Sequence, residues 1–89
     1  ELVLYRKYSI LAAYPDSGKV QYEILQDGHE LFDTIYTEQV EFIVLVETDA
    51  ADSFEKKMTE IFRGAQPFTL REEVYGVWQE GKLSLQSND

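Results

Sequence analysis

The sequence predicts one small α+β domain of four strands and two helices. Four segments rich in Val, Ile, Leu, Phe and Tyr are typical of strands, and two others carry apolar residues at spacings of three and four. The chain has 89 residues, enough for one modest hydrophobic core. Hydrophobic residues make up 44% of it, which is too much for a disordered chain despite a net charge of −9.

The first part of the chain predicts a strand followed by a short helix. The strand covers residues 3–13, and a turn rich in Pro, Asp, Ser and Gly follows it. Asp16 or Ser17 is expected to cap the helix, because both side chains can accept a hydrogen bond from a free amide. The helix covers residues 17–27, and Gly28 is its expected end.

A hairpin comes next, with strands over residues 30–37 and 40–48. The link between them is so short that the two strands must be antiparallel. The second strand is the most apolar segment of the chain, so we place it centrally in the sheet. The residues expected on its helix-facing side are Val40, Phe42, Val44 and Val46.

The remaining chain predicts a second helix and a last strand. Thr48 or Asp49 is the expected N-cap of this helix, and Gly64 is its expected stop. The last strand covers residues 67–78, and the polar residues 79–89 are expected to form a frayed tail.

The element order is therefore βαββαβ, which predicts the split βαβ, or ferredoxin-like, arrangement. A single domain over residues 1–78 would form a four-stranded antiparallel sheet with both helices on one face. The other face would stay open to solvent or to a partner.

The composition excludes several kinds of site. Without cysteine there is no disulfide framework, no thiolate zinc site and no thiol nucleophile. His29, beside Asp27 and Glu30, has two interpretations: a general base tuned by carboxylates, or an exposed turn histidine. We favour the second, because a catalytic site needs a constellation of groups. The acidic run between Asp27 and Glu55 lacks the spacing of a calcium loop. We therefore expect no enzyme, no cofactor and no metal.

The open face of the sheet is the predicted interaction site. Aromatic and basic side chains on such a face can stack on and hold RNA. The acidic net charge opposes binding to phosphates, so contact with a protein is the favoured interpretation. RNA binding and a small-molecule regulatory role remain as alternatives. The residues expected on this face are Tyr5, Lys7, Ile43, Leu45, Thr69 and Arg71.

Three short motifs occur in order along the chain. They are Tyr14-x-x-x-Gly18-Lys19-Val20, Asp33-x-x-Tyr36-x-x-x-Val40 and Phe62-Arg63-Gly64. Over roughly residues 7–75, their order and spacing resemble the C-terminal domain of the IMPACT/YigZ family of bacterial proteins. The resemblance implies a ferredoxin-like fold similar to late domains of elongation factor G. It also implies a separate N-terminal domain ahead of this one, and a biological role that is mostly unassigned.

The resemblance and the first residue, Glu1 rather than Met, predict a piece of a longer protein. The expected role is that of a non-enzymatic accessory domain linked to translation or its regulation. The expected partners are the N-terminal domain of the same protein, a second copy of the chain, or a ribosomal or translation component. No segment reads as a signal peptide or approaches the ~20 apolar residues of a membrane span, so we expect a cytoplasmic protein.

Overall fold

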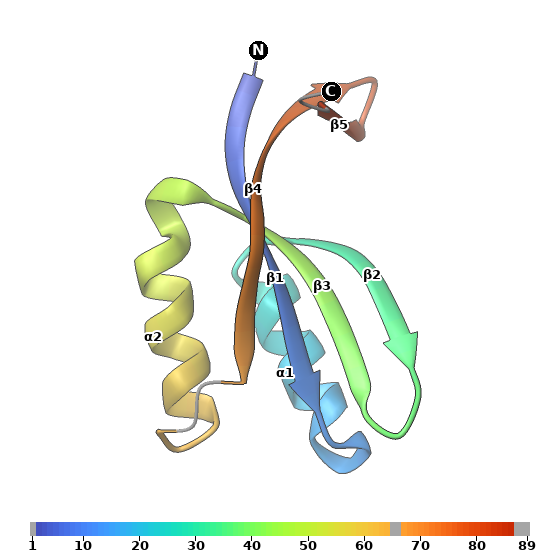
Figure 1. Cartoon of the computed structure of the whole chain (residues 1–89), viewed down its shortest axis with the longest axis vertical. Helices are drawn as coiled ribbons and strands as arrows, with labels where there is room; N and C mark the ends of the chain where they lie inside the picture. The colour runs from blue at the N-terminus through green and yellow to red at the C-terminus, as the bar shows by residue number, and fades with distance from the viewer. Residues whose placement is uncertain (1, 65–66, 87–89) are drawn as a thin grey trace.

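The computed structural model describes residues 2–64 and 67–86 as a twisted antiparallel sheet with two helices (Figure 1). The strand order is β2-β3-β1-β4-β5, so β1 lies in the middle of the sheet. Every neighbouring pair of strands is antiparallel. The elements are β1 (Leu2–Ala12), α1 (Tyr14–Gln26), β2 (Glu30–Tyr36), β3 (Val40–Glu47), the 3₁₀ turn η1 (Thr48–Ala50), α2 (Ala51–Ile61), β4 (Phe68–Gln79) and β5 (Lys82–Gln86).

Both helices pack against the same face of β1 and β3. Tyr8 lies opposite Val44, and Ile10 lies opposite Phe42, so these side chains leave the sheet on one side. The prediction that Val40, Phe42, Val44 and Val46 of β3 face the helices is confirmed. Each large apolar side chain buried here stabilises the fold by about 1.5–3 kcal/mol. The buried core contains Tyr8, Ile10, Ala12, Val20, Ile24, Val40, Phe42, Val44, Val46, Phe54 and Met58.

Helix α1 begins at Tyr14, earlier than predicted. Ala13 is its N-cap residue, has an extended backbone and makes no side-chain capping bond. The expected caps Asp16 and Ser17 lie inside the helix instead, and the Ser17 hydroxyl donates to the Tyr14 carbonyl at 2.8 Å. The helix can start early because Pro15 lies in its first turn, where a missing N–H loses no bond.

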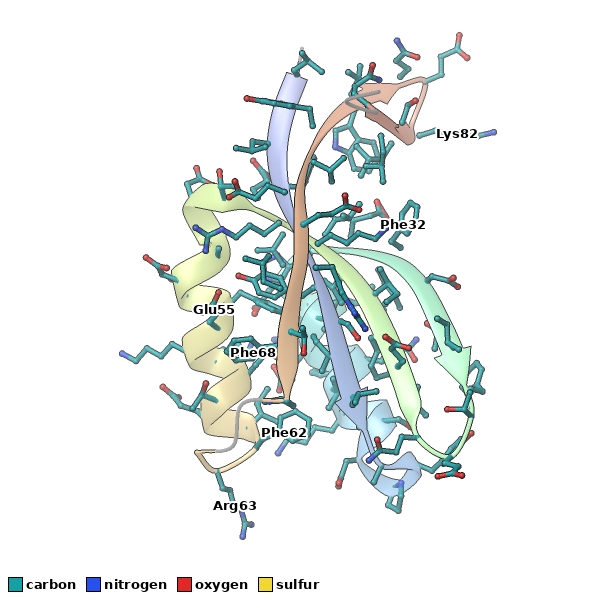
Figure 2. The ribbon with its side chains drawn as sticks, in the orientation of Figure 1. Phe32, Glu55, Phe62, Arg63, Phe68 and Lys82 are labelled. Carbon is teal, nitrogen blue, oxygen red and sulfur yellow. The ribbon has the colours of Figure 1, made fainter. Side chains whose placement is uncertain are left out.

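The C-termini of the two helices differ in which residue adopts the left-handed backbone. Gly28 does so after α1, with φ of +80°, and ends the helix as predicted. After α2 the first left-handed residue is Arg63, with φ of +56°. Its amide donates to Glu60, and the Gly64 amide donates to Thr59 at 2.8 Å, which closes the helix. Figure 2 shows the Arg63 side chain pointing away from the sheet at this end.

The start of α2 also differs from the prediction. Thr48 and Asp49 do not cap the helix; they form the 3₁₀ turn η1 ahead of it. The N-cap position is taken by Ala50, which makes no side-chain capping bond. Asp49 lies in the first turn of η1 and Asp52 lies in the first turn of α2. Both carboxylates interact favourably there with the positive end of the helix dipole.

The largest departure from prediction is a fifth strand. Residues 82–86 were expected in a frayed tail, but they form β5, which pairs with the end of β4. Glu80 and Gly81 make the connection, and both have positive φ, as a two-residue type I′ turn requires. Residues 87–89 of the expected tail lie outside the described residues. The prediction missed this hairpin because Glu-Gly is not the usual Asn-Gly or Asp-Gly turn signal.

Candidate interaction face

The face of the sheet away from the helices carries all the predicted site residues. On β1 and β3 they alternate with the core residues, as the strand period of two requires. Thr69 lies opposite Ser9 on the same face. Arg71 reaches this face at a register shift in the pairing of β4 with β1. The structure therefore brings together Tyr5, Lys7, Ile43, Leu45, Thr69 and Arg71.

Two of these residues are not exposed, contrary to the prediction. Leu45 is 1% exposed and Tyr5 is 5% exposed. Both lie at the end of the sheet where the β4–β5 hairpin adds a further layer. The indole Nε1–H of Trp78 donates to the Tyr5 hydroxyl at 2.9 Å, so the hairpin covers this part of the face. A four-stranded prediction had no segment to cover it.

Three of the other predicted residues line a shallow hollow of about 320 Å³, whereas Thr69 is exposed on the same face outside it. Lys7, Ile43 and Arg71 line it, together with Phe32 and Asp33 from β2 and Glu41 from β3. Phe32 is 48% exposed, which makes it the largest apolar surface of the hollow. This hollow, defined by these six residues, is called the open-face hollow below.

Register shifts place two side chains in the open-face hollow. The pairing of β2 with β3 shifts between Leu31 and Asp33, at Phe32. The pairing of β1 with β4 shifts so that Tyr8 faces Leu70 while Lys7 faces Glu72, which leaves Arg71 as the extra residue. Extra residues of this kind bend a strand and turn a side chain toward a new direction.

The charges of the open-face hollow are largely paired. Lys7 Nζ lies 3.5 Å from a carboxylate oxygen of Glu72 and 5.3 Å from the centre of the Phe32 ring. Arg71 Nη2 lies 3.4 Å from Glu41 Oε2, and the Ser9 hydroxyl also donates to Glu41. A phosphate would have to compete with these carboxylates for both cations. The surface therefore offers apolar area with balanced charge rather than a basic patch.

Sequence reasoning missed Phe32, Asp33 and Glu41 as parts of the site. The sequence does hold one signal for Phe32. Leu31 and Phe32 are adjacent apolar residues in a short strand, where strict alternation would put a polar residue after Leu31. Two adjacent apolar residues in such a strand indicate apolar side chains on both faces of the sheet, because successive side chains of a strand point to opposite faces.

His29 has neither of the two predicted environments. It is half-buried, and its ring packs edge-on against Phe54 with the ring centres 5.1 Å apart. Burial lowers the pKa of His29 below its ordinary value, and this outweighs the neighbouring Asp27 carboxylate, which raises it. The ring serves as a packing element between the end of α1 and α2.

Within residues 2–64 and 67–86, no three His, Asp or Glu side chains converge as metal ligands would. In the same part of the chain, no helix has the length and apolar character needed to cross a bilayer.

Comparison with known proteins gives one match. A family model described as "Domain of unknown function (DUF1949)" matches residues 10–65, from near the end of β1 to just beyond α2. No curated protein and no solved structure matches the chain. The family match covers more than half of the 89 residues and includes both helices and the central hairpin. The chain therefore belongs to the DUF1949 family, a domain of unknown function.

Proposed function

We propose that this chain is the C-terminal domain of an IMPACT/YigZ-type protein and acts as a non-enzymatic interaction domain. The family match supports the first part, because the DUF1949 domain is found at the C-terminus of such proteins. The strand order β2-β3-β1-β4 joined by two helical crossovers is that of the split βαβ motif, which supports a ferredoxin-like core. The sequence resembles a family whose C-terminal domain is similar to late domains of elongation factor G, and this resemblance supports a link to translation.

The apolar surface of the open face is the observation that carries the interaction role. Phe32 and Ile43 meet in the open-face hollow, and Phe32 is half exposed. In the adjacent row of the sheet, Leu11 and Ile35 lie on either side of Glu41. They are 47% and 39% exposed, so the apolar surface continues across three strands. Apolar side chains gathered on one face together with paired charges, as here around Glu41, are typical of a protein contact.

We propose the preceding N-terminal domain of the same protein as the partner. Leu2 pairs with Val77, so β1 begins at the end of the sheet that carries the hairpin. Figure 1 shows the start of β1 and the β4–β5 hairpin at the same end of the sheet. Lys7 of the open-face hollow follows Leu2 by five positions along β1, about 17 Å of extended chain. A domain joined at Leu2 would therefore have the apolar surface within easy reach.

RNA binding is the weaker candidate. Both cations of the open-face hollow already lie against carboxylates, and the chain carries a net charge of −9. Electrostatic attraction to phosphates supplies much of the affinity of nucleic-acid-binding proteins, and this surface lacks it.

The test uses the chain and the preceding domain as separate molecules in a calorimetric titration. Phe32→Ser and Ile43→Thr should each weaken the complex by about tenfold, because each removes buried apolar area worth about 1.4 kcal/mol. The matched control is Leu70→Ser. Leu70 is 47% exposed, like Phe32, but faces the helix side of the sheet beside Tyr8. Equal affinities for all three variants would reject the open face as the docking surface.

A further inference from the structure

Two hollows flank Trp78 at the hairpin end of the open face. The inner hollow, of about 230 Å³, lies between Trp78 and the loop that joins α1 to β2. The outer hollow, of about 330 Å³, lies between the start of β2 and the tip of the β4–β5 hairpin. Trp78 and Glu30 line both hollows, so the two form one groove, called the Trp78 groove below.

The Trp78 side chain forms the wall between the two hollows, and a hydrogen bond holds it in place. Trp78 is 50% exposed, yet its indole N–H is bonded to Tyr5, which is buried in the middle strand. The indole therefore keeps one orientation while half of its surface remains available. A fixed, half-exposed indole is the kind of side chain that anchors protein contacts, because little entropy is lost when a partner covers it.

The inner hollow attracts positive charge. Asp27, Glu30 and Glu47 line it. The Asp27 carboxylate already forms an ion pair with Lys57, because Lys57 Nζ lies 2.8 Å from Asp27 Oδ2. Among the described residues, no Lys or Arg nitrogen lies within 4.0 Å of the Glu30 or Glu47 carboxylates. A hollow with two such carboxylates beside the Trp78 indole offers an ammonium or guanidinium group both ion pairing and a cation–π contact.

The outer hollow combines apolar side chains with polar groups, among them Glu30. Phe32, Leu31, Leu83 and Trp78 line it, and Lys82 lies at its rim. Figure 2 shows Phe32 and Lys82 projecting on the same side of the β4 ribbon. An aliphatic side chain would cover the two half-exposed rings, Phe32 and Trp78, and would add no buried polar group.

We propose that the Trp78 groove binds an extended basic segment of a partner protein. A lysine or arginine side chain occupies the inner hollow, and a neighbouring apolar side chain occupies the outer hollow. Charge complementarity selects this occupant, because the chain carries a net charge of −9 and the inner hollow carries two carboxylates. The inner hollow is smaller than the ~300–1,000 Å³ typical of small-ligand pockets, which suits a single side chain. This inference goes beyond docking at the open-face hollow, and Ile43 takes no part in it.

The test follows the chain's one tryptophan by NMR during titration with a short peptide. The probe is acetyl-Ser-Lys-Ser-Leu-Ser-amide in about 0.1 M salt, which screens non-specific attraction. Saturable movement of the Trp78 indole N–H signal is expected. A peptide with norleucine in place of lysine keeps the aliphatic stem but lacks the charge, and should bind at least about tenfold more weakly. Equal binding of the two peptides would overturn the proposal.

Matched variants distinguish binding in the Trp78 groove from non-specific attraction by the net charge of the chain. Glu30→Gln and Glu47→Gln keep the size of the side chain. Each should lower the affinity of the chain for the lysine peptide by about fivefold to tenfold. Glu38→Gln makes the same charge change in the β2–β3 turn, outside both hollows, and should change affinity by less than about twofold. Ile43→Thr should leave the affinity unchanged. Equal weakening by all three glutamate variants would show non-specific attraction and reject the groove, whatever the fate of the open-face hollow.

Discussion

The Trp78 indole donates a hydrogen bond to the Tyr5 hydroxyl across 2.9 Å, although 73 positions separate the two residues. This bond joins the last hairpin to the middle strand of the sheet. It explains why Tyr5 and Leu45 are buried on a face that is otherwise open. It also fixes the wall of the Trp78 groove, so the fifth strand contributes to the candidate site as well as to the fold.

The close approach of the hairpin to β1 favours glycine at position 76. A Cβ at Gly76 would lie 2.8 Å from Leu83 Cδ1 and 3.0 Å from Tyr5 Cε2. We expect Gly76→Ala to lower the free energy of unfolding by about 1 kcal/mol, because the Leu83 side chain and the Tyr5 ring must shift to make room. Gly18→Ala is the control. Gly18 lies in α1 with open space around it, so alanine should stabilise by about 0.5–1 kcal/mol. Urea denaturation that ranks the two variants in the opposite order would contradict this geometry.

The two-residue turn before β5 gives a second prediction. Glu80 has φ of +52°, a backbone conformation that asparagine tolerates better than glutamate. Glu80→Asn should raise the free energy of unfolding by about 0.5–1 kcal/mol. Glu80→Thr should lower it, because a β-branched residue fits this conformation poorly. If thermal denaturation shows no difference between the asparagine and threonine variants, the hairpin is not formed as described.

The end of α2 gives a third prediction. Arg63 has φ of +56° at the position where glycine is the usual residue. Arg63→Gly should therefore stabilise the chain by about 1 kcal/mol in chemical denaturation. Lys56→Gly serves as the control in the interior of α2, where glycine should cost about 1 kcal/mol. Destabilisation by both glycine variants would contradict the left-handed helix end.

The environment of His29 predicts a pH dependence. Burial lowers its pKa below the ordinary value of 6.5, so the unfolded chain binds the proton first as the pH falls. Below about pH 6.5 the free energy of unfolding should therefore decrease, and the loss should level off once the pH passes below the folded-state pKa. Between about pH 7.5 and about pH 5.5, the native chain should lose more stability than His29→Gln. An NMR titration that places the pKa of this one histidine above 6.5 would contradict the assignment.

The sequence predicted the core of this fold well because its periodicity there is strong. β3 alternates apolar residues with period two, and α2 carries Phe54 and Met58 at helical spacing. Helix boundaries were less predictable. Pro15 reads equally well as a turn residue or as a residue of the first helical turn, and the second case holds here.

The candidate site was predicted in position but not in detail. Strand alternation correctly placed Lys7 and Ile43 on the open face. It could not show that Leu45 is covered, because the covering segment comes from a weak hairpin signal far along the chain. Nor could it show the register shifts at Phe32 and Arg71, because bulges in strand pairing depend on the register between two strands.

The most direct measurement maps the proposed contact between this chain and the N-terminal domain that we propose precedes it. The chain is labelled with ¹⁵N, and the unlabelled domain is titrated into it. The account predicts that amide signals of Lys7, Phe32 and Ile43 shift in a saturable manner, while those of Tyr22 and Leu70 on the opposite side do not. Shifts confined to the helix side, or no shift at saturating concentration, would contradict the open face as the docking surface.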